Sequence, residues 1–203
     1  DKTTVFVGDN MDGSTLYSTA CVYGGITNTL DDCGNVNSAL GGGQGTAAGA
    51  SYDIGNGFTG AIGYTGDGSS TSGLMTKEGL DAYGGQLTYT ADSYGASVTY
   101  ALIEGAASTD VTYWALNGYF TPSESGSMPS ISVGYEMGDP EKVGEKDTSA
   151  FFVGLQWDEV GPGTLGAALG TSGHIKDAET EYYMYEAFYS YPVNDGMTVT
   201  PLV

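Results

Sequence analysis

The stretch SISVGYEM at residues 130–137 decides the fold, because large apolar side chains alternate in it with small, polar or charged ones. Its apolar members are Ile131, Val133, Tyr135 and Met137. Successive side chains of a strand point to opposite faces, so these four lie on one side of an extended chain. The segments 113–120 and 148–157 alternate in the same way. Each unit is about ten residues long, and a tilted strand that crosses a bilayer has about 9–11.

The same alternation predicts ten strands in the larger part of the chain. They are expected near 46–54, 58–65, 82–91, 95–103, 111–120, 129–137, 148–157, 164–171, 180–191 and 197–203. Residues 1–45 are less regular, with short strands at 3–7 and 16–23. We therefore expect an irregular N-terminal segment at 1–45 that belongs to a barrel, followed by an antiparallel β-meander at 46–203.

The connections between these strands alternate in length. Tight-turn sequences occur at 56–57, 92–95, 123–126, 161–163 and 194–196, and longer connections fall near 66–80, 103–110, 138–147 and 172–179. Outer-membrane barrels join their strands by short turns at one end and longer loops at the other. The pattern predicts an all-β fold: an antiparallel up-and-down transmembrane β-barrel, or a large part of one.

The charge of the chain argues against nucleic-acid binding. Asp and Glu number 25 against five lysines, which gives a net charge of −20. Nucleic-acid binding needs clustered cationic side chains, so no nucleic-acid partner is expected. Four lysines fall in the long connections and none in a predicted strand, although lysine favours loops in any β protein. These four are Lys77, Lys142, Lys146 and Lys176.

Cys21 and Cys33 are the only cysteines, and we expect a disulfide between them. The bridge would close a loop of about a dozen residues, worth roughly 3 kcal/mol in the chain-entropy model. Two free thiols or a metal site are the alternatives, but the only histidine, His174, is far away in the sequence. A disulfide indicates an oxidising compartment.

No constellation of residues points to catalysis, so an enzyme is not expected. His174 lies in a loop that contains Gly and Asp, without a constellation of Cys, Ser or Asp around it, and is expected to be a solvated loop residue. Segments 9–13 and 65–69 faintly suggest calcium loops but lack the ligand spacing of an EF-hand. The glycine-rich segment 41–45 lacks the lysine of a phosphate loop. No cofactor and no dedicated metal site are expected.

Several segments together resemble cyanobacterial outer-membrane porins, the kind with an N-terminal S-layer-homology domain that is related to carbohydrate-selective porins. The segments are STACVYGG at 18–25 with LDDCG at 30–34, WDEVGPG at 157–163, and YSYPVNDGMTVTP at 189–201. The resemblance implies a monomeric or trimeric diffusion channel in the outer membrane. The S-layer-homology region, the coiled coil after it and the terminal aromatic of such porins are missing, so we expect this sequence to be part of a porin.

The expected function is a passive channel that prefers cations. Five side chains on the polar strand faces are expected to line the pore: Gln86, Asn117, Glu136, Gln156 and Glu186. The expected partners are outer-membrane lipid, small ions and hydrophilic solutes. The resemblance also implies a homo-oligomer in the form of a trimer. The alternative is a secreted or surface-exposed β-structural or adhesive protein that assembles through strand edges. Its aromatic rows would then face a second sheet instead of lipid.

Overall fold

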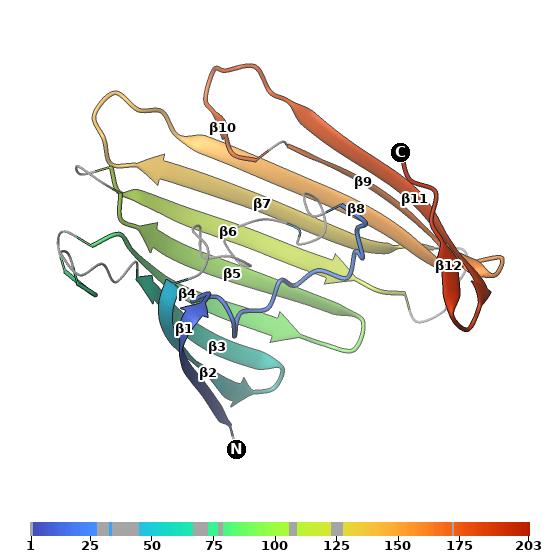
Figure 1. The fold of residues 1–203 in the computed structure, drawn as a ribbon, viewed down its shortest axis with the longest axis horizontal. Helices are drawn as coiled ribbons and strands as arrows, with labels where there is room; N and C mark the ends of the chain where they lie inside the picture. Colours follow the sequence, from blue (N-terminus) through green and yellow to red (C-terminus); the bar gives the residue numbers. More distant parts are fainter. Residues whose placement is uncertain are drawn as a thin grey trace.

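The computed structural model describes residues 2–27, 33, 45–66, 73–76, 79–105, 109–122, 128–171 and 173–203. They form one curved antiparallel sheet of twelve strands (Figure 1). In chain order the strands are β1 (Thr3–Met11), β2 (Gly45–Gly55), β3 (Phe58–Gly66), β4 (Asp81–Thr90), β5 (Tyr94–Ile103), β6 (Val111–Phe120), β7 (Ser130–Pro140), β8 (Thr148–Val160), β9 (Gly163–Thr171), β10 (Ile175–Lys176), β11 (Tyr183–Asn194) and β12 (Met197–Val199). Among these residues, no helix is long and apolar enough to cross a bilayer.

The sheet is an up-and-down meander, as the sequence predicts. Strands β1 to β9 pair in chain order, β11 follows β9, and β12 follows β11. Two-residue β10 is the exception, because it folds back from the β9–β11 connection and pairs with β8. Long connections follow β3, β5, β7 and β9, so an antiparallel meander places all four at the same end of the sheet.

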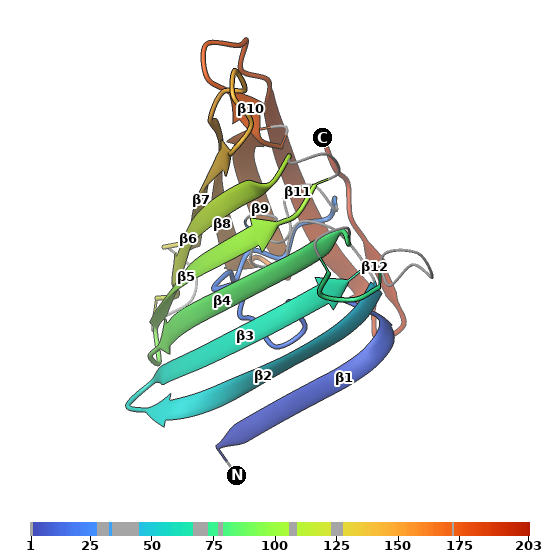
Figure 2. The same ribbon diagram turned by 90° about the vertical axis from the view of Figure 1, so that its left-hand side faces the viewer.

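The predicted barrel closure is not observed. In the part of the chain that the structure describes, β1 pairs only with β2 and forms one edge of an open sheet, with β12 at the other edge. The sheet is nevertheless strongly bent, and the chain that follows β1 runs inside the bend (Figure 2). The described fold is thus a curved, open antiparallel sheet with a convex and a concave face.

The convex face exposes large apolar side chains from one edge of the sheet to the other. One cross-strand row runs from Ile62 through Gly85, Tyr100 and Trp114 to Met137. Exposed members of this face include Val7, Ile62, Leu87, Trp114, Leu116, Tyr135, Val153, Leu169 and Tyr185. Monomeric soluble proteins rarely expose a contiguous apolar patch of more than a few hundred Å². An exposed apolar face that runs across the sheet is therefore unusual for a soluble monomer.

The concave face carries small and polar side chains, and it is the buried one. A cross-strand row of this face, next to the Tyr100–Trp114 row of the convex face, passes through Gln86, Thr99, Ala115 and Glu136. All four are buried. The buried apolar residues form two small clusters on this face, one around Tyr23, Phe152 and Phe188 and one around Ala101. What covers them is the N-terminal chain, not a second sheet.

Candidate functional site

The segment that covers the concave face is here called the strap: residues 13–27 together with Cys33. It leaves the long-connection end of β1 and crosses the sheet from β3 to β11 without forming a strand. Its backbone N–H groups donate to sheet side chains in chain order: Gly13 to Thr65 Oγ1 at 2.6 Å, Ser18 to Gln86 Oε1 at 2.7 Å, Val22 to Ser132 Oγ at 3.0 Å, Gly24 to Gln156 Oε1 at 2.9 Å, and Thr27 to Glu186 Oε2 at 2.8 Å.

The strand predicted at 16–23 is therefore wrong, and these contacts give the reason. A buried backbone N–H must find an acceptor, and a strand finds it on a neighbouring strand. Here the acceptors are side-chain oxygens that stand up from the sheet, such as those of Gln86 and Ser132.

Two tyrosines anchor the strap to the sheet. Tyr17 packs on the alanines at positions 82, 101 and 115, where small side chains leave room for its ring. Tyr23 is buried between Phe152 and Phe188, with ring centroids 5.5 and 6.0 Å away. Its hydroxyl donates to Glu186 Oε1 at 2.7 Å. Because aromatic side chains supply a large apolar contact area, these two residues fix where the strap crosses the sheet.

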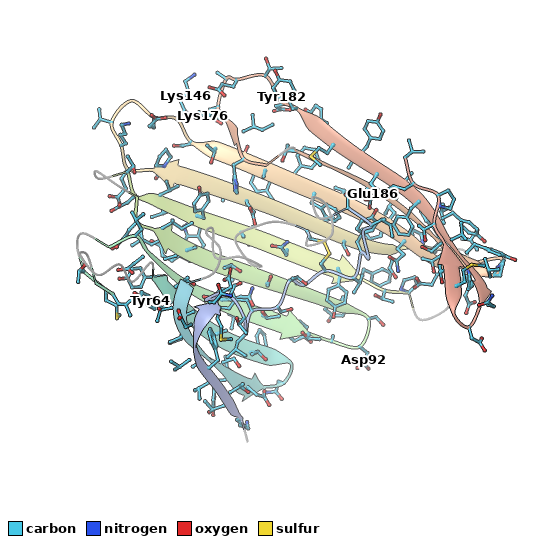
Figure 3. All side chains as sticks on the ribbon, viewed as in Figure 1. Tyr64, Asp92, Lys146, Lys176, Tyr182 and Glu186 are labelled. Atoms are coloured by element: carbon cyan, nitrogen blue, oxygen red, sulfur yellow. A yellow bond between two sulfur atoms is a disulfide. The ribbon has the colours of Figure 1, made fainter. Side chains whose placement is uncertain are left out.

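The Glu186 carboxylate is the main polar attachment of the strap. Besides the Tyr23 hydroxyl, it accepts hydrogen bonds from the backbone N–H of Ile26 at 3.1 Å and of Thr27 at 2.8 Å. Only 3 % of Glu186 is exposed, and a buried charge needs such donors. Figure 3 shows this residue pointing from β11 toward the strap.

Glycines in the sheet make the close crossing possible. A Cβ on Gly134 would overlap the carbonyl oxygen of Cys33, and a Cβ on Gly63 would overlap that of Gly13. At Gly154 it would lie 2.7 Å from the ring of Tyr23. The glycine content of the strands thus has a specific use here, since the strap backbone rests directly on the sheet.

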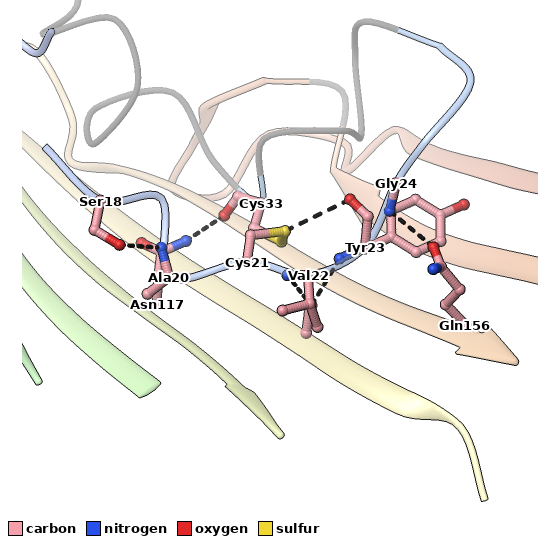
Figure 4. Close-up of a disulfide and its surroundings, with 10 residues drawn as sticks. Ser18, Ala20, Cys21, Val22, Tyr23, Gly24, Cys33, Asn117 and Gln156 are labelled. Atoms are coloured by element: carbon pink, nitrogen blue, oxygen red, sulfur yellow. Dashed lines mark hydrogen bonds between the residues drawn. A yellow bond between two sulfur atoms is a disulfide. The ribbon is translucent and has the colours of Figure 1, made fainter. Parts of the chain in front are cut away.

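The predicted disulfide between Cys21 and Cys33 is confirmed. The Cα atoms are 6.0 Å apart, and neither cysteine belongs to a strand. The carbonyl oxygen of Cys33 accepts a hydrogen bond from Asn117 Nδ2 at 2.5 Å (Figure 4). The bridge therefore ties the strap to a second attachment point over the middle of the sheet.

The five residues predicted to line a pore all lie on the concave face, where four are buried and Gln156 is half-buried. Gln86, Asn117, Gln156 and Glu186 contact the strap through the hydrogen bonds given above. The fifth, Glu136, is 1 % exposed. Their role in lining a pore stays a prediction. The structure adds that all of them except Glu136 hold the strap, a role that no local sequence pattern indicates.

His174 is not the solvated loop residue that the sequence predicts. Its Nε2 lies 3.0 Å from Glu136 Oε2, and its ring lies 5.0 Å from that of Tyr113. Only 17 % of the His174 side chain is exposed. The connection after β9 therefore folds back over the sheet and closes the concave face beside the strap. The contact partners are 38 residues apart in the sequence, which is why the pattern misses them.

The ends of the long connections carry most of the described surface charge. Lys146 and Lys176 lie at this end of the sheet, and Asp92 lies at the opposite one (Figure 3). Glu145 contacts Lys176 at 3.0 Å and Lys142 at 3.8 Å. The hydrogen bond with Lys176 lowers the pKa of the Glu145 carboxyl and raises that of the lysine. Acidic residues still outnumber lysines here. Of the charged residues in the long connections, Asp67, Lys77 and Glu78 lie outside the described residues.

The segments that the sequence analysis considered as metal or phosphate sites are only partly described. Within the described ranges, no three His, Cys, Asp or Glu side chains are grouped to hold a metal ion. In the calcium-like segment 9–13, the Asp12 carboxylate accepts hydrogen bonds from Ser14 and so forms a local turn. Most of the second such segment, and of the glycine-rich segment at 41–45, lies outside the described residues. No protein-family model matches the chain, and no curated protein matches it.

Proposed function

We propose that this protein is part of an outer-membrane channel whose convex face meets lipid and whose concave face meets water. The observation that carries the proposal is that the sheet exposes its apolar face and buries its polar face, the reverse of the usual arrangement in soluble proteins. The long strands expose apolar rows on the convex side and bury polar rows on the concave side. Barrels that span outer membranes alternate apolar-out and polar-in in this way.

The arrangement of the connections supports the same proposal. Turns of two residues at 56–57 and 161–162 lie at one end of the sheet, and the long, charged connections lie at the other. Open strand edges are costly in lipid, so the proposal requires that the β1 and β12 edges are paired in the bilayer. The proposal also includes assembly into a homotrimer and a location in the outer membrane.

The strap restricts the path along the concave face. It covers Gln86, Asn117 and Glu186, so small ions and hydrophilic solutes, including small carbohydrates, would pass beside the strap. Passive diffusion needs no catalytic group and no cofactor. Since Glu136 and Glu186 are buried, they contribute less to ion preference than acids at the mouth.

Charge at the long-connection end favours cations. Its exposed acids include Asp139, Glu141, Asp147, Asp177 and Glu179. Of the three lysines described at this end, Lys142 and Lys176 pair with Glu145. A mouth lined by one sign of charge concentrates counter-ions and repels co-ions.

Planar-bilayer recording of the full-length protein tests the proposal. In a salt gradient, we expect a cation-selective reversal potential that weakens as the Debye length falls from about 30 Å at 0.01 M to about 3 Å at 1 M. The triple variant Asp139→Asn, Asp147→Asn, Asp177→Asn should lose more selectivity than the double variant Glu136→Gln, Glu186→Gln. An anion-selective wild type, or no channel at all, would contradict the proposal.

The open edges favour one other candidate function. In the described part of the chain, β1 presents unpaired N–H and C=O groups along a nine-residue edge. A secreted or surface-exposed adhesive protein could assemble by pairing such edges. Dependence on detergent separates the two candidates. The channel should aggregate when detergent is removed, whereas a strand-edge assembly should stay in solution as regular oligomers or fibres.

A further inference from the structure

We propose that a pocket at the long-connection end of the sheet binds a small phosphate monoester through three lysines. The whole chain has only five lysines, and three of them line this one pocket: Lys142, Lys146 and Lys176. Figure 3 shows Lys146 and Lys176 close together at this end. The pocket and its test do not depend on the channel proposal, so either can fail without the other.

The pocket lies on the concave side, where β6 begins and β7 ends. Val111 and Tyr113 of β6 line it, and they point to the same side of that strand as the buried Ala115. Pro140 of β7 and Thr148 of β8 line it as well, and its volume is about 240 Å³. Pockets for drug-sized ligands have about 300–1,000 Å³, so this one suits a smaller molecule. The apolar part of the lining suits the carbon skeleton of an organic solute.

The charge of the lining suits a doubly charged anion. Three lysines and one carboxylate, that of Glu145, give the lining a net charge of +2 in a chain whose net charge is −20. Glu145 pairs with Lys142 and Lys176, whereas Lys146 has no carboxylate partner in the part of the chain that the structure describes. A phosphate monoester carries about −1.5 to −2 charges at pH 7, and lysine is a common phosphate binder.

Basic and acidic side chains at this end of the sheet are sorted between its two faces. The convex side has a separate hollow, beside Trp114, whose charged lining residues are all aspartates: Asp139, Asp147 and Asp177. Lys146 and Lys176 directly precede two of these aspartates in the sequence, and successive side chains of an extended backbone point to opposite faces. The alternation thus places the lysines in the pocket and their acidic neighbours outside it.

Backbone hydrogen bonds hold the segments that carry the lysines. Strand β10, which contains Lys176, pairs with the start of β8, and the Asp177 N–H donates to the Asp147 carbonyl oxygen at 2.9 Å. In the β7–β8 connection, the Glu145 N–H donates to the Lys142 carbonyl oxygen at 3.1 Å and closes a turn. Because the backbone of the pocket is already ordered, a ligand does not have to order it on binding, which favours affinity.

Isothermal titration of the full-length protein in detergent with glucose 6-phosphate tests the pocket. We expect one saturable site for this ester and no saturable binding of glucose, which has the same carbon skeleton without the phosphate. Lys146→Gln should weaken the binding of the ester about tenfold, because it removes a charge-assisted hydrogen bond to the phosphate. Lys2→Gln is the matched control, since it removes the same charge near Gly55 at the opposite end of the sheet. That variant should bind the ester as the wild type does.

A lipid headgroup is a second source of the same phosphate chemistry. A short-chain phosphatidic acid in mixed micelles separates the two sources, and we expect it to bind more weakly than glucose 6-phosphate, because the pocket lies on the concave side, away from the exposed apolar face. Tighter binding of the lipid would overturn the assignment to a soluble ester. The proposal also fails if the wild type shows no saturable binding of the ester, if glucose binds equally well, or if Lys146→Gln and Lys2→Gln bind the ester with equal affinity.

Discussion

On strand β6, Trp114 and Leu116 are about half exposed on the convex face, whereas Ala115 and Asn117 between and beside them are buried on the concave face. The difference holds across the sheet: apolar side chains are uncovered and polar ones are covered. A soluble protein buries its apolar face because that is the main source of its stability. This molecule reverses that arrangement, and the proposal that its apolar face meets lipid rests on the reversal. Its strap packs on the concave face through Tyr17 and Tyr23.

The largest effect is expected from removing the aromatic anchor of the strap. Tyr23→Ala leaves a cavity between Phe152 and Phe188 and should lower the free energy of unfolding by about 3–5 kcal/mol. The matched control is Tyr185→Ala on the convex face, where 73 % of the side chain is exposed. Urea unfolding in detergent micelles measures both variants. Equal losses at the two positions would remove the distinction between a packed concave face and an unpacked convex one.

A smaller effect is expected from a charge on the convex face. In lipid vesicles, Leu116→Lys should destabilise the protein by about 2–4 kcal/mol, the cost of a cation near the bilayer midplane. Val143→Lys is the control, because Val143 is fully exposed in the connection between β7 and β8. That substitution should change stability by less than about 0.5 kcal/mol. If Leu116→Lys is as mild as the control, the convex face does not meet lipid.

The sheet could be predicted from the sequence because the information is local. Alternation places Trp114 and Leu116 on one face within a few residues, and turn sequences such as the AsnGly at 56–57 mark the strand ends. Nine of the ten strands predicted after residue 45 accordingly agree with observed ones to within a few residues, whereas the tenth, predicted at 197–203, ends at Val199. Two-residue β10 gives no such signal, because it lacks the length over which alternation can be seen.

The strap could not be predicted, because its partners are distant in the sequence. The Val22 N–H finds its acceptor on Ser132, 110 residues away, and Tyr23 reaches Glu186 across 163 residues. Nothing in the local pattern indicates that a glycine at position 134 makes room for a crossing backbone. Alternation in the sequence places the polar residues of the concave face on one side of the strands. Their contacts with the strap could not be predicted, because these depend on how the whole sheet bends.

The central claim is that the convex face contacts lipid, and fluorescence quenching of Trp114 tests it most directly. The protein has two tryptophans, so a Trp157→Phe variant in vesicles reports on Trp114 alone. Acrylamide serves as the aqueous quencher, since it is neutral and is not repelled by the acidic chain. We predict strong quenching by lipids brominated in their acyl chains and little quenching by acrylamide. Strong quenching by acrylamide with none by brominated lipid would contradict the account.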